Sequence, residues 1–382
     1  MKRNGTAAKL SRETTRCVRL TLAMHDSGSQ IERQNWQQQL TRLIVVLFQK
    51  KQNDVLEQAL DYLWVADPKA CDALAELIES HAESLTEDAH SNAVLLAIPV
   101  LVWSRYSIPA GKISRQRLQE LREQLQAHLL ASDTRLALAD MLYSPDQLPR
   151  GFIETRALLQ QLAEQATVQQ DLIMDATGMT EAGEYVADIR YIFAAVVVNK
   201  SAPVFRWQQS DMTQHEVLQM WQLHTQSLFA AMLPGCHIKP LLPNAFFSAW
   251  RKIEQEARAF SLHAAVSYLC ETLHVLPAEL RAAIAPCYDQ TLEEYRIGFS
   301  LLKGSDVLHG VVWALVGEED EDSDIAHQIE AELTELGKVV VLTNSLPTEY
   351  CDDCGSPLFP NAEGDLLHPE MPETDNQITH LH

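Results

Sequence analysis

Residues 292–360 decide how this chain folds, and they read LEEYRIGFSLLKGSDVLHGVVWALVGEEDEDSDIAHQIEAELTELGKVVVLTNSLPTEYCDDCGSPLFP. Apolar side chains alternate with other residues from Tyr295 to Phe299, a period of two that predicts a half-buried strand. The turn residues 303–306 follow, and the β-branched and aromatic run 307–316 predicts a second strand. We therefore expect an antiparallel hairpin.

The second half of this stretch predicts a helix and a further strand. Apolar residues recur at helical spacing from Ile325 to Leu336, and Gly337 follows where a left-handed cap is favoured. The short apolar run 339–342 predicts a buried strand that returns to the same sheet. Together these elements indicate a protein of the α+β class.

A similar order of elements occurs earlier in the chain. The pattern of a helix followed by strands, a second helix and a last strand runs through 155–243 and again through 262–347, and each copy closes on a Leu-Pro pair. We therefore predict a tandem duplicated α/β domain over 153–347, with strand–strand–helix–strand repeats and a helical connection between them. The alternative is that alternating helices and strands resemble one another by default.

The first 152 residues predict a different architecture. Residues 31–152 carry apolar faces at helical spacing with short connections, which is typical of an irregular all-helical domain. Residues 1–30 start with a cluster of lysines and arginines and are expected to form a basic N-terminal arm. Because no aromatic side chain interleaves the arm to stack on bases, we expect it to dock on this acidic protein and not on nucleic acid.

Charge and hydropathy limit the binding partners and the cellular location that we expect for the chain. Its 382 residues carry a formal net charge of −22, and the region 317–382 holds seventeen carboxylates against Lys338 alone. Such a surface repels nucleic acid and anionic membranes. The longest apolar run, 93–103, is too short to span a bilayer, and the N-terminus lacks the apolar segment of a signal peptide. We expect a cytoplasmic protein that binds a protein partner or self-associates, with no nucleic acid and no membrane.

The pair Cys351 and Cys354 is the strongest chemical signal. The seven cysteines are otherwise scattered, which favours reduced thiols over a disulfide framework. Two thiolates two residues apart, followed by Gly355, are typical of a zinc knuckle. Residues 356–368 predict a small hairpin that returns His368 to the sulfurs. We expect a zinc-ribbon-like knuckle over 348–373, with a structural zinc ion bound by Cys351, Cys354 and His368.

Several points about this knuckle stay open. Glu370, Cys236 and His237 are the candidates for a fourth ligand. An unmetallated structural knuckle is one alternative to zinc, and a redox-active dithiol is another, although the two aspartates between the sulfurs disfavour the low thiol pKa of a redox pair. Residues 374–382 have little apolar content and are expected to form a disordered tail.

The common catalytic signatures do not occur. The sequence has no His-Glu-x-x-His and no Gly-x-Ser-x-Gly, and the glycine pair 178 and 183 lacks the lysine of a phosphate-binding loop. We therefore expect a non-enzymatic interaction or regulatory protein, with no catalytic residue assigned. The alternative is an enzyme or small-molecule binder that uses a cleft between the two repeats, where Arg296, His309 and Glu294 could converge.

Five segments carry a resemblance to a known family. The sequence resembles an uncharacterised bacterial family of cytosolic proteins that is known only as a domain of unknown function, and the resemblance covers most of the chain. The family brings no activity with it, so it implies no catalytic residue. The segments are Pro99-Val-Leu-Val-Trp-Ser-Arg-Tyr-Ser-Ile-Pro109, Ser144-Pro-Asp-Gln-Leu-Pro149, Glu293-Glu-Tyr-Arg-Ile-Gly-Phe299, His309-Gly-Val-Val-Trp313 and Cys351-Asp-Asp-Cys-Gly355.

Overall fold

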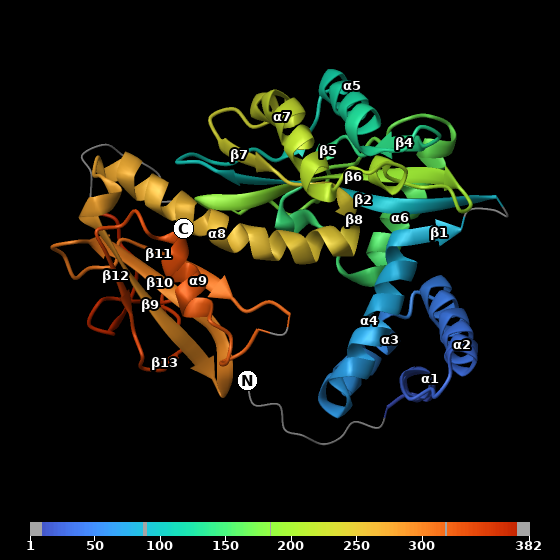
Figure 1. The fold of residues 1–382 in the computed structure, drawn as a ribbon, viewed down its shortest axis with the longest axis horizontal. Coiled ribbons are helices and arrows are strands. Elements are labelled where there is room, and N and C mark those ends of the chain that lie inside the picture. Colours follow the sequence, from blue (N-terminus) through green and yellow to red (C-terminus); the bar gives the residue numbers. More distant parts are fainter. Residues whose placement is uncertain (1–9, 87–89, 184, 318, 373–382) are drawn as a thin grey trace.

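The computed structural model describes residues 10–86, 90–183, 185–317 and 319–372 (Figure 1). It contains an N-terminal helical bundle, a first sheet, a second sheet and one long helix that contacts both sheets. The α+β class predicted from the sequence is confirmed. Across these ranges, none of the helices has both the length and the apolar surface that crossing a membrane requires.

The N-terminal bundle buries one continuous apolar core. Ser11, Ser29 and Asp67 begin three of its helices by accepting hydrogen bonds from first-turn amides. Pro68 then takes the first helical position, where its missing amide proton has no cost. The helices of the bundle are α1 (Arg12–His25), α2 (Gln30–Gln49), α3 (Asn53–Ala66) and α4 (Pro68–Glu83).

The prediction of a basic arm over residues 1–30 is wrong for most of that range. Residues 12–25 form helix α1, in which Cys17 and Leu20 are buried in the bundle. Arg12, Arg16 and Arg19 lie on the exposed side of the same helix. Because these arginines are three to four residues apart, they share one helical face, so the predicted basic arm is the charged face of an amphipathic helix. Residues 1–9 lie outside the described ranges.

The first sheet is built around two long antiparallel strands, β2 and β6, which pair from Ser91 opposite Asn199 to Trp103 opposite Ala187. The order of strands is β1-β2-β6-β4, and β7 and β8 also pair with β2. A separate short ladder joins β3 to β5. The strands are β1 (Ser84–Thr86), β2 (Ser91–Trp103), β3 (Gly111–Lys112), β4 (Arg135–Leu138), β5 (Met141–Leu142), β6 (Ala187–Asn199), β7 (His237–Pro240) and β8 (Asn244–Ala245).

The predicted all-helical domain over 31–152 therefore ends at Glu83, and this prediction is wrong beyond that point. The apolar run 93–103, interpreted as helical, is the central strand β2. Helices cover both of its faces, so apolar side chains occupy every position and the period of two disappears. A short, continuously apolar run of this kind cannot be assigned to a strand or a helix by periodicity alone.

Helices lie on both sides of the first sheet (Figure 1). One face packs against α5 (Arg115–Gln124), its π-helical extension Leu125–Leu129, and α7 (Gln214–Met232). The other face packs against α6 (Gly151–Thr167) and the first half of α8 (Phe246–Leu273). Short 3-10 turns also occur in the connections of the chain, at Pro145–Gln147, Arg206–Gln208 and, between α8 and the second sheet, Pro277–Glu279.

The second sheet contains the strands and the helix predicted for 292–347, although the last strand, predicted to be buried, is half-exposed or exposed along its length. Strands β10 and β11 form the expected hairpin, α9 follows, and β12 returns parallel to β9. The order of strands is β11-β10-β9-β12, with β13 also on β9. The elements are β9 (Leu280–Asp289), β10 (Thr291–Leu301), β11 (His309–Ala314), α9 (Ile325–Glu332), β12 (Lys338–Val341) and β13 (Leu346–Pro347).

Helix α8 joins the two sheets and is the helical connection that the sequence predicted. Phe246 and Ile253 in its first half belong to the core of the first sheet, and Leu262 and Leu269 in its second half belong to the core of the second. Figure 1 shows it running from one sheet to the other. The second half of α8 and helix α9 cover one face of the second sheet.

The predicted superposition of 155–243 on 262–347 is wrong. The first range has one long strand, β6, and a 3-10 turn at 206–208 where a second strand was expected. The partners of β6 are β2 and β4, which precede residue 155. In addition, β7 is antiparallel to its neighbour β2, whereas β12 is parallel to β9. Patterns of local periodicity do not specify which distant strands pair, so similar patterns can build different sheets.

Candidate metal centre

The C-terminal segment, residues 348–372, lies on the face of the second sheet opposite α8 and α9. Side chains alternate between the faces of a strand, and Ile297 and Phe299 of β10 belong to the core beneath the helices. Arg296 and Gly298 therefore point to the other face, where the C-terminal segment packs. Its hairpin, β14 (Phe359–Pro360) and β15 (Leu366–Leu367), was predicted and is confirmed.

Arg296 fastens both ends of the knuckle loop to the sheet. Its side chain is wholly buried, and its Nε donates to Glu294 Oε1 at 2.7 Å. Its Nη1 donates to the backbone carbonyls of Glu349 and Leu358, the latter at 2.9 Å. The guanidinium also lies over the Tyr350 ring, 5.0 Å from the ring centroid. One arginine thus holds the two strands of chain that enter and leave the loop containing both cysteines.

A pair of glycines lets the hairpin approach the sheet closely. Gly298 of β10 and Gly310 of β11 are directly opposite each other. A methyl group on Gly310 would overlap the Phe359 ring, and one on Gly298 would overlap the carbonyl oxygen of Pro360. Glycine is therefore favoured at both positions, because the C-terminal hairpin occupies the space of a side chain: the Pro360 backbone at Gly298 and the Phe359 ring at Gly310.

The knuckle itself is a tight turn from Cys351 to Ser356. The Gly355 amide donates to the Cys351 carbonyl at 2.9 Å, and the Cys351 amide donates to the Ser356 carbonyl at 2.8 Å. Gly355 has a φ of +73°, which a residue with a side chain rarely adopts. The Cys-x-x-Cys-Gly spacing predicted this turn, and Asp352 and Asp353 are exposed on it.

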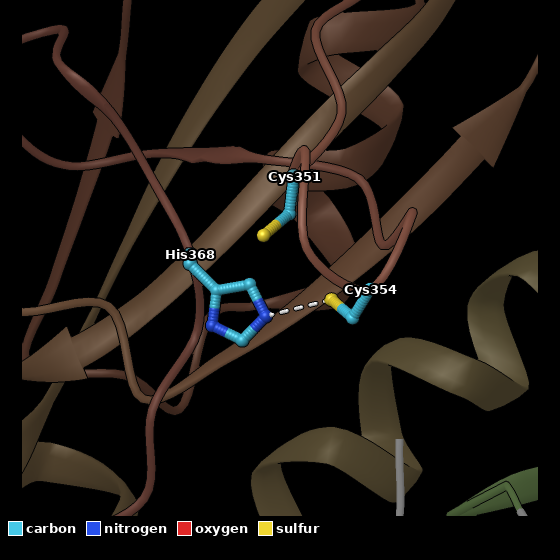
Figure 2. Close-up of side chains that lie close together, drawn as sticks. All are labelled: Cys351, Cys354 and His368. Atoms are coloured by element: carbon cyan, nitrogen blue, oxygen red, sulfur yellow. Dashed lines mark hydrogen bonds between the residues drawn. The ribbon is translucent and has the colours of Figure 1, made fainter.

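The three predicted metal ligands converge. The hairpin brings His368 back to the knuckle, and its Nε2 lies 3.3 Å from Cys354 Sγ. One ligand atom from each of Cys351, Cys354 and His368 lies within 4.8 Å of the others, and Figure 2 shows the three side chains pointing toward one another. Tetrahedral zinc, with Zn–S of about 2.3 Å and Zn–N of about 2.0 Å, places ligand atoms roughly 3.5–3.8 Å apart. The residues therefore fit a zinc ion with small adjustments of the side chains.

The surroundings of Cys354 favour its thiolate. Hydrogen bonds from the side chain and the backbone amide of Ser356, and then from His368, lower the pKa of the Cys354 thiol to about 6. At neutral pH this sulfur is then mostly ionised, which is the form that binds metal. By contrast, burial raises the pKa of Cys287 to about 11 and that of Cys17 to about 12, so neither of these buried thiols is suited to bind a metal.

None of the three candidates for a fourth ligand joins the cluster. His237 is the first residue of β7 and Cys236 directly precedes it; His237 stacks on Trp103 with ring centroids 4.3 Å apart. Glu370 faces the other ring nitrogen of His368, with Oε1 3.9 Å from Nδ1. A carboxylate on that side is suited to orient the imidazole, as carboxylates often do behind metal-bound histidines. The sequence could not reveal that Cys236 and His237 lie outside this cluster.

The structure does not bring together the three residues of the alternative functional site. Arg296 and Glu294 form an ion pair on the face of the sheet beneath the C-terminal segment. His309 is paired with Phe299, so its side chain is on the opposite face, where it contacts Tyr268 of α8. Burial lowers the pKa of His309 to about 4, so this imidazole is neutral at physiological pH. His309 is therefore a structural residue beneath α8.

Among the hollows elsewhere in the described part of the chain, two lie between packed elements and contain ionisable side chains. A cavity of about 940 Å³ lies between the helical bundle and the first sheet, and Arg156 lines it while donating to the His81 carbonyl. A hollow of about 350 Å³ lies between α8, β7 and α9. Its charges form pairs: Lys239 with Glu256 at 2.8 Å, and His263 with Glu332 at 3.1 Å. In neither hollow do unpaired acids and bases converge as they would for catalysis.

Sequence reasoning missed the anchoring role of Arg296, although a signal was present. An arginine inside an apolar strand, two residues after an acid, occurs here and again as Asp188 and Arg190 in β6. Arg190 is also wholly buried, pairs with Asp188, and donates to the carbonyls of Ile108 and Pro109. Each sheet thus has a buried arginine that holds a loop passing over one of its strands. The spacing acid-x-Arg within a strand would have identified both arginines.

Comparison with known proteins gives one match. The model of a family described as a protein of unknown function, DUF2863, matches residues 2–381. No curated protein and no solved structure matches the chain.

Proposed function

Because this chain belongs to the DUF2863 family, whose function is unknown, we propose from its own geometry that it is a non-enzymatic cytosolic interaction or regulatory protein with a zinc-stabilised C-terminal segment. The observation that carries the proposal is the convergence of Cys351, Cys354 and His368 on a segment anchored by Arg296. Zinc at this position would cross-link the knuckle to the hairpin and so hold the whole segment in one conformation. Its role there is structural.

An interaction role is supported by the apolar surface of the helical bundle. Ile31 is 83% exposed, Trp64 67% and Val65 85%. Trp64 and Val65 are consecutive residues at the end of α3, and Ile31 is at the start of α2. Exposed tryptophan beside aliphatic side chains is typical of the buried centre of a protein interface. A protein partner, or a second copy of this chain, would cover this surface.

An enzymatic or small-molecule-binding role between the two sheets is the other candidate, and it would need residues different from those first considered. Arg296 and His309 lie on opposite faces of the second sheet, and the ionisable groups of the hollow between α8 and β7 pair with one another. We therefore favour the interaction role.

The metal centre is tested by metal content. We expect protein purified without a histidine tag to contain about one equivalent of zinc, and Cys354→Ser to contain less than about a tenth, because a zinc site with two protein ligands is weak. Cys270→Ser is the matched control, since Cys270 lies on α8 and outside the cluster. Mass spectrometry of the metal decides this. Equal and low zinc in all three proteins would leave an unmetallated knuckle.

The interaction role is tested with a surface variant. We expect Trp64→Ala combined with Val65→Ser to weaken capture of the partner by roughly 30-fold, because loss of a central tryptophan typically costs about 2 kcal/mol or more. Tyr106→Ala is the control, since Tyr106 is also exposed but lies outside the bundle. Quantitative mass spectrometry of proteins retained from native lysate, with sedimentation to detect self-association, provides the measurement. Unchanged capture and unchanged sedimentation in the double variant would contradict a role for this surface.

A further inference from the structure

The cavity between the helical bundle and the first sheet contains a positive charge with no described acid beside it. Its volume of about 940 Å³ is in the range of pockets that hold small organic molecules. Arg156 of α6 lines it, and no carboxylate occurs among the described lining residues. The chain has 52 acidic and 30 basic side chains, so an arginine in an acid-free cavity is unexpected. An anionic ligand would supply the missing charge.

Arg156 itself forms no ion pair with a described carboxylate. Its Nη1 donates to the His81 carbonyl, and its guanidinium lies 5.3 Å from the centroid of the Phe48 ring. By contrast, the half-buried Arg122 and Arg258 each pair with an acid. Burial lowers the pKa of Arg156, because its surroundings stabilise the positive charge less well than water does. The N–H donors on Nε and Nη2 are suited to a carboxylate, which arginine binds through two parallel hydrogen bonds.

Gln208 adds an uncharged donor to the lining of the same cavity. Its Oε1 accepts from the backbone amides of Val204 at 2.8 Å and Phe205 at 2.9 Å, which leaves the protons of its own amide group for another acceptor. Another part of the lining is aliphatic and consists of valines from α2, from the two long strands and from the loop after β6, namely Val45, Val94, Val198 and Val204. The cavity thus combines one cation, a neutral donor and apolar surface.

This combination favours a monocarboxylate over a phosphate. Phosphate sites typically combine several cations or use the amides at a helix N-terminus. Arg156 is the one lysine or arginine among the described lining residues. A planar carboxylate matches the fork of a single guanidinium, and the valines would bury a hydrocarbon chain.

We propose that this cavity binds a small aliphatic carboxylate, whose charged group pairs with Arg156 and whose hydrocarbon part packs against the valines. The inference goes beyond the proposed function and does not depend on the metal centre. Thr41 of α2 and Asn92 of β2 both line the cavity, so the ligand would contact the bundle and the sheet together. Binding would therefore stabilise the packing of the bundle on the sheet as the ligand concentration rises.

The test titrates full-length protein with hexanoate and follows backbone amide shifts by two-dimensional NMR. We expect saturable shifts at the residues that line the cavity, with a Kd of about 1 mM or lower for a ligand of so few atoms. Arg156→Gln should raise this Kd by roughly 10-fold or more, because a hydrogen bond to a charged group is lost. Arg42→Gln is the control, since Arg42 is exposed on α2 and outside the cavity lining. Hexanol, which lacks the charge, should bind the wild type as weakly as hexanoate binds Arg156→Gln.

A second variant keeps the test independent of any effect of Arg156 on folding. Thr41→Trp would fill the cavity from α2 and should abolish the hexanoate shifts, while circular dichroism reports whether each variant is folded. Absence of saturable shifts in the wild type at millimolar hexanoate would overturn the inference. Equal affinity for hexanoate and hexanol, or tighter binding of inorganic phosphate, would overturn the ligand class. Unchanged hexanoate binding in folded Thr41→Trp would show that the acid binds outside this cavity.

Discussion

Glu294→Ala is expected to destabilise the protein by about 3–5 kcal/mol, because removing one partner of a buried ion pair leaves the other charge uncompensated. Arg296 is wholly buried, and the side chain of Glu294 is 16% exposed. The variant leaves the Nε of Arg296 without its acceptor at 2.7 Å, in a place that water reaches poorly. Urea unfolding followed by tryptophan fluorescence measures the change.

The neighbouring residue provides a matched control. Glu293 is on the same strand but exposed, so Glu293→Ala should change the free energy of unfolding by less than about 0.5 kcal/mol. We also expect faster proteolysis of residues 349–372 in Glu294→Ala, because Arg296 holds the carbonyls of Glu349 and Leu358. Equal stability of the two variants would show that the buried pair is not the anchor described here.

The second large effect is expected at the glycine pair. Gly310→Ala should displace the hairpin from the second sheet, since the added methyl group would occupy the space of the Phe359 ring. Overpacking of this kind typically costs about 1–3 kcal/mol of stability. Gly298→Ala would add a clash with the Pro360 backbone, so the variant with both substitutions should be less stable than Gly310→Ala alone. Limited proteolysis after Pro347 and urea unfolding measure docking and stability.

A compensating substitution tests whether steric overlap causes the expected loss of hairpin docking. Phe359→Ala removes the ring that the new methyl group would meet, so in the Gly310→Ala background it should recover part of the lost docking. All three described ligands lie within 351–368, so the zinc content of Gly310→Ala should stay near that of the wild type even when the segment is undocked. Additive effects in the double variant, or loss of zinc with Gly310→Ala, would contradict this description of the interface.

The parts of the site that could be predicted are those set by neighbours in the chain. The spacing of Cys351, Cys354 and Gly355 specifies a turn, and the short hairpin beyond it determines where His368 returns. Each of these steps spans fewer than twenty residues, so few alternative conformations compete with it. The candidates Cys236 and His237 failed because more than a hundred residues separate them from the knuckle, and only the packing of two sheets decides that distance.

The errors in the predicted fold also arise from contacts between residues that are distant in the sequence. The run 93–103 has the apolar composition of a buried element, but its pattern does not distinguish a helix from a strand. It forms a strand because it pairs with β6, nearly a hundred residues later. In residues 12–25 the apolar positions are helical and the basic ones share a face, so the pattern was present, but the charges dominated its interpretation. The acid-x-Arg spacing in β6 and β10 was visible too, yet its role depends on which loop crosses the strand.

The sequence by itself determined the α+β class, the hairpin β10–β11 with α9 and β12, and the knuckle with its three converging ligands. These features follow from periodicity, turn residues and spacing, all of which act over one or two neighbouring elements. Tertiary structure decided that β2 pairs with β6, that Arg296 and His309 point to opposite faces, and that Gly298 and Gly310 receive the C-terminal hairpin. Hydrogen bonds between distant strands and close contacts between sheet and hairpin form only in the folded chain, and local pattern does not encode them.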